Sequence, residues 1–340
     1  MIHERVAKGE TEVSKKNKPI RAKLIANPGA GNVLEAASRI EQVTHYLVDY
    51  GLKVDVALAH PKREAIPIVR RAIKDGYDIV IAMGGDGTLG EVIRGIAGSK
   101  VSLGIIAAGT ENDIARSLGI PEDLKEACAL IASGHIRKVD LGQISTKKTK
   151  KYYFFMVSTI GLSATLFPMI AEVPEGKFSG IKDAVMTFLK FDSKPKAFLT
   201  LDDESKIEVE TMLVTIANTP IIGLKNLVAP DASMDDGLLD IAVYPNFGKA
   251  ELLSYFAKTA HESSTPDRTI QRYRARKIKV KTSPKLDVAA EGIILGKGTA
   301  RIKVLPRALR VIAPEPGTGA EKPPEKAAKE LPEPVSPVSK

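Results

Sequence analysis

The sequence predicts an α/β domain, with a largely parallel sheet and helices on both faces, followed by a second domain made mainly of antiparallel strands. Three observations support this fold class. From about residue 20 to residue 145, short β-branched runs alternate with stretches of helical period. Three of the runs end in glycine-rich loops. After residue 145 the helical pattern fades and strand-like runs follow one another.

The elements of the first domain follow from these patterns in order. A strand is expected at Arg21–Ala26, and Gly51 ends the helix that comes next. One face of this helix is predicted from its apolar residues at helical spacing, which are Leu34, Ala37, Ile40, Val43 and Leu47. The following elements are predicted as a strand at residues 52–58, a helix at 63–74, and strands at 78–83 and 102–106.

The rest of the chain divides by composition. Residues 20–145 are assigned to the first domain and residues 146–305 to the second. Residues 1–19 form a basic arm, and the Pro, Lys and Glu content of residues 315–340 is typical of a disordered tail. In the second domain, strands are expected at residues 152–159, 197–201, 207–216, 239–244, 277–281 and 300–304, with one helix at 249–260.

The central loop, which follows the run at residues 78–83, has the composition of a phosphate-binding turn. Gly84, Gly85 and Gly87 let backbone N–H groups approach an anion closely, and the next helix points its positive end toward it. The carboxylate of Asp86 would repel a phosphate unless a cation lay between them, so its presence indicates Mg²⁺. Thr88 offers a hydroxyl to a phosphate oxygen. The alternative is an ordinary strand-to-helix turn with Asp86 as a helix cap.

Two further loops, at residues 27–32 and 107–113, also follow strands. Parallel strands place their carboxyl ends at one edge of a sheet. We therefore expect Asn27, Gly84–Thr88 and Gly109–Asn112 to converge on one nucleotide site.

Composition limits the partners and the location. The formal net charge of +9 favours an anionic partner, such as a nucleotide or an acidic membrane surface. The chain has no Trp and 5% aromatic residues, which argues against nucleic acid as the partner. The single cysteine, Cys128, is expected in a helix core. No apolar run is long enough for a membrane span and no signal peptide follows Met1, so we expect a cytoplasmic protein.

The motifs NPGAGN, GGDGTLGEV and GTENDIARSLGIP occur in this order, followed by KVDLG, STIG, LVAPDASMDDGLL and LPRALRVIAP. This set closely resembles the diacylglycerol kinase catalytic domain, and most closely the bacterial YegS-like lipid kinases, which are relatives of sphingosine and ceramide kinases. The resemblance covers about residues 20–314. It implies an ATP-binding α/β domain, a lipid-binding antiparallel β-sandwich, and a last strand near residues 306–314 that returns to complete the first domain.

The resemblance also implies a site. It places Asp86 and Asp140 near the phosphates, and it places a Mg²⁺ ion in the second domain, although the residues there alone indicate simple turn chemistry. The metal positions correspond to Ser233, Asp236 and Leu238. The ATP-binding positions correspond to Asn27, Gly84, Gly85, Asp86, Gly87, Thr88, Gly109, Thr110 and Asn112.

The chain departs from the family pattern at the catalytic base. Similar proteins carry Asp-Gly-Glu-Pro-Leu before the last strands, whereas this chain has Glu291 at the Asp position and Ile293 at the Glu position. Only one carboxylate remains, so Glu291 is the candidate base. The alternative is a glutamate on a surface turn.

Three functions therefore stay open. The first is an ATP- and Mg²⁺-dependent kinase for a diacylglycerol-like or sphingoid lipid, acting in lipid metabolism or phospholipid biosynthesis at the cytoplasmic membrane face. The second is a kinase of NAD, whose fold shares the GGDGT loop, and the third is a nucleotide- and lipid-binding protein with little kinase activity. A basic run at Arg272, Arg274, Arg276, Lys277, Lys279 and Lys281 suits either a solvated strand or anionic head groups. Related proteins often form homodimers, so a dimer is also possible.

Overall fold

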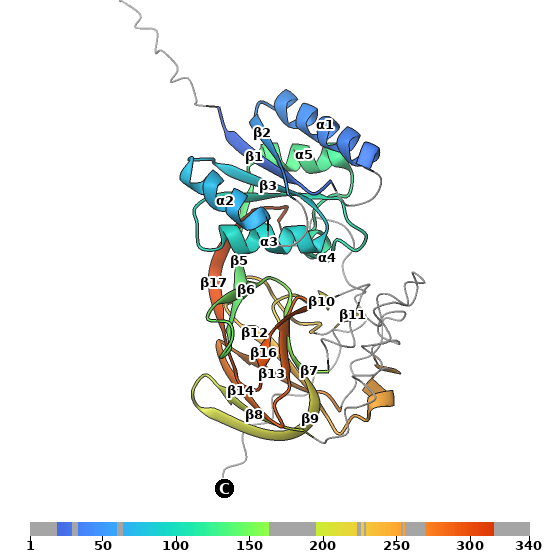
Figure 1. Ribbon diagram of the computed structural model, residues 1–340, viewed down its shortest axis with the longest axis vertical. Helices are drawn as coiled ribbons and strands as arrows, with labels where there is room; N and C mark the ends of the chain where they lie inside the picture. Colours follow the sequence, from blue (N-terminus) through green and yellow to red (C-terminus); the bar gives the residue numbers. More distant parts are fainter. Residues whose placement is uncertain are drawn as a thin grey trace, which may run out of the picture.

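The computed structural model describes residues 19–28, 33–59, 64–162, 195–222, 226–227, 229–252, 254–255 and 269–315. An α/β domain lies above a β-sandwich domain in Figure 1, and long strands run from one into the other. The predicted fold class is confirmed. The predicted N-terminal arm up to residue 18, the tail from residue 316, and residues 29–32 of the first glycine loop lie outside the described residues.

The α/β domain has a parallel sheet in the order β2-β1-β3-β4, with helices on both faces (Figure 1). Its strands are β1 (Arg21–Ala26), β2 (Lys53–Leu58), β3 (Ile79–Gly84) and β4 (Ser102–Ala107). Its helices are α1 (Val33–Asp49), α2 (Ala65–Lys74), α3 (Asp86–Ile96), α4 (Asp113–Ser117) and α5 (Leu124–Ser133).

Side chains that alternate along β3 separate the two helical layers. Ile81 packs in one cluster with α1 and α5, whereas Val80 packs in another with α2 and α3. Cys128 of α5 is fully buried, as predicted. Among the α1 residues whose burial is described, Val43 and Leu47 are buried as predicted, but Ala36 is buried and Ala37 is exposed.

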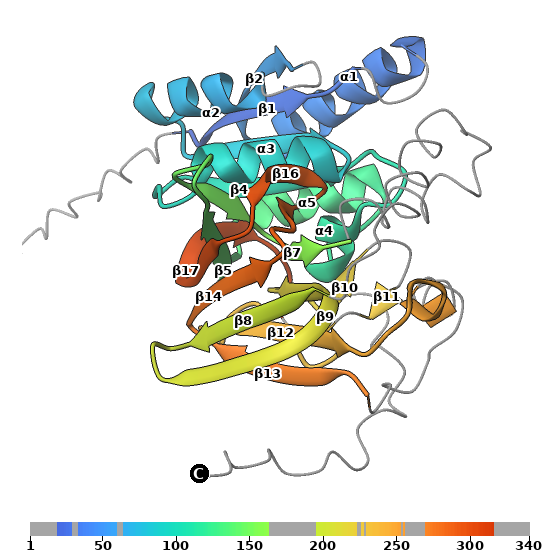
Figure 2. The same cartoon turned by 60° about the horizontal axis from the view of Figure 1, so that its bottom comes forward.

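The second domain consists of two packed layers of strands (Figure 2). One layer contains β6 (Tyr152–Phe154), β5 (Ile136–Ser145), β17 (Ala300–Ile312), β14 (Lys277–Ser283) and β8 (Lys196–Leu201). The other contains β16 (Ile293–Lys297), β15 (Asp287–Ala290), β7 (Val157–Gly161), β12 (Leu239–Pro245) and β13 (Gln271–Ala275). Strand β9 (Ser205–Ala217) pairs with both layers, and the short strands β10 (Ile221–Ile222) and β11 (Asn226–Leu227) pair with each other. The predicted helix at residues 249–260 is described only in part.

Strand β17 joins the domains. Near its end Val311 pairs in parallel with Leu103 of β4, whereas near its start Ala300 pairs with Val280 of β14. Strand β5 is its antiparallel neighbour along almost the whole length. Because these hydrogen-bonded strands are continuous, the position of one domain relative to the other is fixed by main-chain pairing. No helix in the described part of the chain is both long and apolar enough to cross a membrane.

Candidate functional site

The loops after β3 and β4 touch at the edge of the parallel sheet. Gly84 lies opposite Ala107 in the register, and the N–H of Ala108 donates to the carbonyl of Gly84 at 3.1 Å. A Cβ atom on Gly109 would lie 2.4 Å from the Cα of Gly85, which is too close for any side chain. Glycine is needed at this contact because the two backbones meet there.

The third strand end reaches the same place. The N–H of Asn27 donates to the carbonyl of Met83 at 3.1 Å, and its side-chain amide donates to the Thr88 hydroxyl at 3.3 Å. The structure thus brings together the three strand ends that the sequence placed on one cleft. Glycine backbone and the N-terminal end of α3 meet there, which suits phosphate.

Asn112 shapes the loop after β4. Its backbone is left-handed, with φ of 54°, and its side chain both accepts from the N–H of Gly109 and donates to the carbonyl of Gly109, each at 2.9 Å. Thr110 remains exposed at the tip of the loop. Asn112 therefore fixes the loop conformation, and Thr110 is exposed to solvent.

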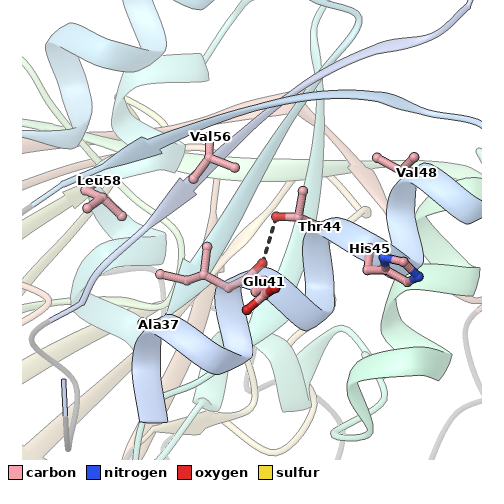
Figure 3. Close-up of a pocket in the computed structure, with 8 residues that line it drawn as sticks. Ala37, Glu41, Thr44, His45, Val48, Val56 and Leu58 are labelled. Atoms are coloured by element: carbon pink, nitrogen blue, oxygen red, sulfur yellow. Dashed lines mark hydrogen bonds between the residues drawn. The ribbon is translucent and has the colours of Figure 1, made fainter. Parts of the chain in front are cut away.

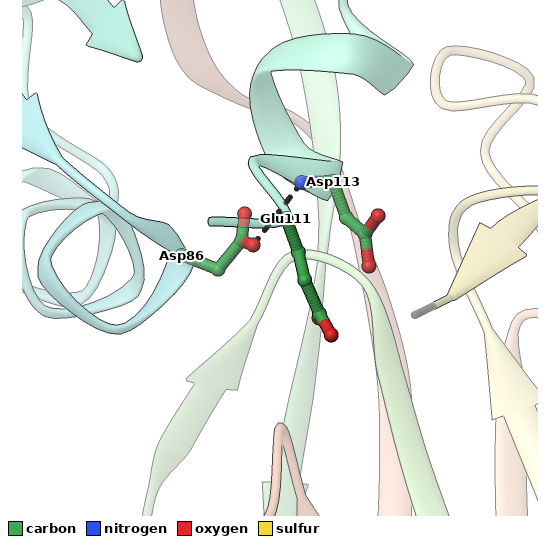
Figure 4. A group of neighbouring side chains, drawn as sticks. All are labelled: Asp86, Glu111 and Asp113. Carbon is green, nitrogen blue, oxygen red and sulfur yellow. Dashed lines mark hydrogen bonds between the residues drawn. The ribbon is translucent and has the colours of Figure 1, made fainter. Parts of the chain in front are cut away.

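Asp86 is the first residue of α3, but its side chain caps the start of α4. Its carboxylate accepts from the N–H groups of Asp113 and Ile114, at 3.1 Å and 2.9 Å, at the start of α4 (Figure 4). One carboxylate oxygen each of Asp86, Glu111 and Asp113 lies within 4.8 Å of the others. Asp113 also pairs with Arg116 at 2.9 Å. These three carboxylates offer the hard oxygen ligands that Mg²⁺ prefers.

Glu291 comes from the second domain and lies against the first. It forms, with Gly292, the two-residue turn between β15 and β16, and both residues have positive φ, 48° and 76°. Its Oε1 accepts from the N–H groups of Phe155 (2.7 Å) and Met156 (3.2 Å), and its Oε2 pairs with Arg94 of α3 at 3.1 Å. The alternative of a surface turn is wrong, because only 9% of this side chain is exposed.

Burial changes the chemistry of Glu291. Desolvation raises the pKa of its carboxyl group, and the Phe155 N–H and the Arg94 guanidinium oppose that effect only in part. Arg94 itself is 11% exposed and stacks over the ring of Tyr152 at 5.0 Å. A Cβ atom on Gly90 would lie 3.2 Å from Glu291 Oε2, so a glycine in α3 leaves room for this carboxylate.

Ile293, which stands at the family's Glu position, packs against the apolar core of the second domain. A carboxylate there would be placed against apolar side chains and would lose solvation. Ile293 therefore contributes to the apolar core in this chain, and Glu291 is the carboxylate of the turn.

Asp140 is fully buried at the junction of the domains. Its two oxygens accept from the N–H groups of Gly237 and Arg307, each at 2.7 Å. Burial raises the pKa of the Asp140 carboxyl group above its ordinary value, and the two N–H donors offset only part of that rise. These contacts make Asp140 a structural link between β5, β17 and the turn at residues 231–238, and its place near the phosphates stays a prediction.

The predicted metal positions in the second domain form an ion-paired turn. Asp236 accepts from the N–H of Leu238 at 2.9 Å and pairs with Arg274, whose Nε also lies 3.3 Å from Asp240. The Ser233 hydroxyl donates to Asp235 at 2.6 Å. Arg274 neutralises Asp236 in this arrangement, so a cation would have to compete with the guanidinium, and the metal site at Ser233, Asp236 and Leu238 stays a prediction.

A shallow apolar groove of about 520 Å³ lies between α1 and β2 (Figure 3). Its walls include Ile40 and Val48 of α1 and Leu58 of β2. None of the candidate site residues lines this groove, so it is separate from the glycine loops.

The fold and the loops define a two-domain kinase class, in which an α/β domain with glycine-rich loops at one sheet edge is joined to a β-sandwich. A model of the diacylglycerol kinase catalytic domain matches residues 21–144, and a model of the YegS C-terminal NAD kinase beta sandwich-like domain matches residues 171–313. The chain belongs to the diacylglycerol kinase family with the YegS type of second domain, and the resemblance seen in its motifs is confirmed.

Individual relatives agree with this family. A protein named diacylglycerol kinase from Bacillus subtilis (strain 168) is 27% identical over 305 residues, which cover 87% of this chain and 97% of the relative. One of the same name from Mycobacterium tuberculosis (strain ATCC 25618 / H37Rv) is 28% identical over 300 residues, covering 86% and 95%.

Solved structures show the same fold. The crystal structure of a putative diacylglycerol kinase from Bacillus anthracis str. Sterne has a TM-score of 0.69 at 25% identity and covers 88% of this chain and 99% of its own. An NAD kinase from Archaeoglobus fulgidus in complex with ATP has a TM-score of 0.50 at 13% identity, covering 87% and 94%. The second likeness is one of fold alone.

Gly109→Ala is expected to destabilise the protein by about 1–3 kcal/mol, because the new methyl group must displace the Gly85 loop. Thermal unfolding followed by circular dichroism measures the effect. Gly87→Ala is the matched control, since a Cβ there meets nothing within 4 Å and alanine favours helix α3. An equal loss in both variants would contradict the backbone contact.

Glu291→Gln is expected to flatten the pH dependence of stability. A carboxyl group whose pKa is raised by folding binds more protons in the folded state, so its stabilising contribution is present below the ordinary pKa and is lost as pH rises through the raised pKa. Urea unfolding between pH 4 and pH 8 should therefore favour the Gln variant increasingly over the native protein at higher pH. Glu35→Gln is the matched control, because Glu35 is exposed and pairs with Arg39. Parallel curves for the native protein and Glu291→Gln would refute the burial effect.

Arg274→Gln is expected to cost more stability at pH 8 than at pH 5. Burial raises the pKa of Asp240 to about 6, and Arg274 opposes this rise. Without Arg274 the ionised Asp240 loses its partner, at a cost of about 1–2 kcal/mol at pH 8, whereas at pH 5 the group is largely protonated. Arg276→Gln, at an exposed neighbouring arginine, is the control. An equal loss of stability at both pH values would show that the ionisation of Asp240 does not depend on Arg274.

Proposed function

We propose that this protein transfers the γ-phosphoryl group of ATP to the hydroxyl of a diacylglycerol-like or sphingoid lipid, with Mg²⁺. The observation that carries the proposal is the position of Glu291, a buried carboxylate from the second domain, against α3, where it lies beside Gly90 and pairs with Arg94. That helix begins at Asp86, beside the contact of Gly85 with Gly109. A proton acceptor and a phosphate-binding edge thus come from different domains and meet at one helix.

The loops of the first domain support ATP as the donor. Backbone N–H groups at residues 84–88 and at Thr110, together with the N-terminal end of α3, are suited to phosphate oxygens. Asp86, Glu111 and Asp113 would hold Mg²⁺, which supplies positive charge to the phosphates during transfer. The names of the relatives, and the ATP in the solved NAD kinase, agree with such a donor.

Glu291 is proposed as the general base. The acceptor hydroxyl oxygen forms a bond to the γ-phosphorus while the bond from that phosphorus to the bridging oxygen breaks, so ADP leaves with the electron pair. The hydroxyl proton goes to Glu291. A raised pKa makes this carboxylate a better proton acceptor near neutral pH, and the N–H groups of Phe155 and Met156 keep it oriented.

The proposed lipid acceptor also implies where the protein would act. A lipid with long acyl chains resides in a bilayer, so the proposed reaction takes place where the protein meets the cytoplasmic face of a membrane. We propose contact at the surface of the bilayer.

The test is transfer of ³²P from γ-labelled ATP, with Mg²⁺, into a total bacterial lipid extract and, in a parallel reaction, into NAD. We expect a labelled lipid and no labelled NAD. Asp86→Asn should abolish the label, and Glu291→Gln should lower kcat by at least about 100-fold because the base is removed. Asp49→Asn, an exposed carboxylate at the end of α1, is the control and should keep full activity.

Three other outcomes would contradict the proposal. Label in NAD would replace the lipid kinase with an NAD kinase. Tight ATP binding without any labelled product would favour a nucleotide- and lipid-binding protein. Full activity in Glu291→Gln would remove Glu291 from the chemistry.

A further inference from the structure

The solvent side of the layer that contains β14 and β17 is strongly basic. Along β14, buried residues alternate with exposed ones, and the exposed ones before Ser283 are lysines. Along β17, Arg301 and Lys303 are exposed in the same alternation. We call these side chains the basic face, and its members are Lys277, Lys279, Lys281, Arg301 and Lys303.

Like charges lie directly opposite one another on the basic face. Lys277 pairs in register with Lys303, and Lys279 pairs with Arg301. Directly opposed like charges on antiparallel strands destabilise a sheet. Among the described residues Asp203 pairs with Lys277 at 3.4 Å, but no ion pair involves Lys279, Lys281, Arg301 or Lys303. Nothing in the described fold requires this charge, and it weakens the pairing of the two strands.

A second basic element, which we call the lysine loop, borders this face. It contains the lysines of residues 147–151, and it follows Ser145, which lies opposite Arg301. The Thr146 and Thr149 hydroxyls both donate to the carbonyl of Leu295, at 2.7 Å and 2.9 Å. These two bonds fix the loop to β16, so its lysines are held at the surface. The neighbouring Ile294 is 53% exposed, which places an apolar side chain beside them.

The chemistry of these elements fits a diffuse anionic surface. Almost all of the cations are lysines, which act as point charges and do not offer the planar fork with which arginine recognises a single phosphate. They lie on the neighbouring strands β14 and β17 and in the loop that follows β5 (Figure 2). We propose that the basic face and the lysine loop dock this protein on the surface of an anionic bilayer.

This docking would set the distance between the membrane and Glu291. The lysine loop is bonded to Leu295, four residues along the hairpin from Glu291, which corresponds to about 13 Å of strand. The inference rests on the proposed function in one respect, because it gives a lipid kinase its route to a substrate in a bilayer. The charge pattern itself does not depend on the reaction.

The test is binding to vesicles of pure phosphatidylcholine and to vesicles with phosphatidylglycerol, measured by sedimentation at low and high salt. We expect binding only to the anionic vesicles and a loss of binding at high salt. The variant Lys279→Gln/Arg301→Gln should bind about 25-fold more weakly, since each cation near an anionic surface contributes about fivefold. Its melting temperature should equal or exceed that of the native protein, because a like-charge pair is removed.

The matched control is Lys53→Gln/Lys74→Gln, two exposed lysines of the α/β domain, and it should bind like the native protein. An equal loss of vesicle binding in the control would show that binding depends on net charge alone. Unchanged binding of Lys279→Gln/Arg301→Gln would refute the basic face as the docking surface. Binding to a polyanion such as heparin without binding to anionic vesicles would also overturn the proposal. All these readouts are independent of catalysis. If lipid phosphorylation fails while the vesicle results hold, only the proposed function is lost.

Discussion

The pairing of β5 with β17 is the constraint on which the rest of the structure depends. Both strands pass through both domains, and β17 has hydrogen-bonded neighbours in each of them. A register shift in this pair contains Arg307, whose N–H is bound by Asp140 of β5. Asp140 also binds Gly237, so one buried carboxylate ties the turn at residues 231–238 to the two strands. Strand β15 of the other layer pairs with β7, and Glu291 at the end of its hairpin reaches Arg94 of α3.

The site combines rigid backbone with one buried charge. Gly85 and Gly109 bring two loops into contact, and Asn27 and Asn112 hold the loops on either side. Glu291 reaches this region from the second domain, where two N–H groups and Arg94 offset part of the cost of its burial. The carboxylate is thus positioned by contacts from both domains. A change that moves either domain would move it away from the glycine-rich edge of the sheet.

The sequence predicted the α/β layers well, because periodic apolar runs and glycine loops mark parallel strands and their ends. It also placed the three strand ends on one edge. The β15–β16 hairpin was missed, since the run Asp287–Ala290 is short and rich in alanine. The pairing of Asp236 with Arg274 was not predicted, because the two residues are distant in sequence. Likewise, the burial of Glu291 depends on Arg94, almost two hundred residues away, and local patterns carry no information about such pairs.

The most direct test of the nucleotide site is a backbone amide NMR titration of the full protein with ATP and Mg²⁺. The largest shifts should occur at Gly85, Gly87, Thr88, Gly109 and Thr110, whose N–H groups lie at the sheet edge. Amides of β14, which lies in the second domain, should not move. Saturable ATP binding without any change at these glycines would place the nucleotide elsewhere and contradict the account.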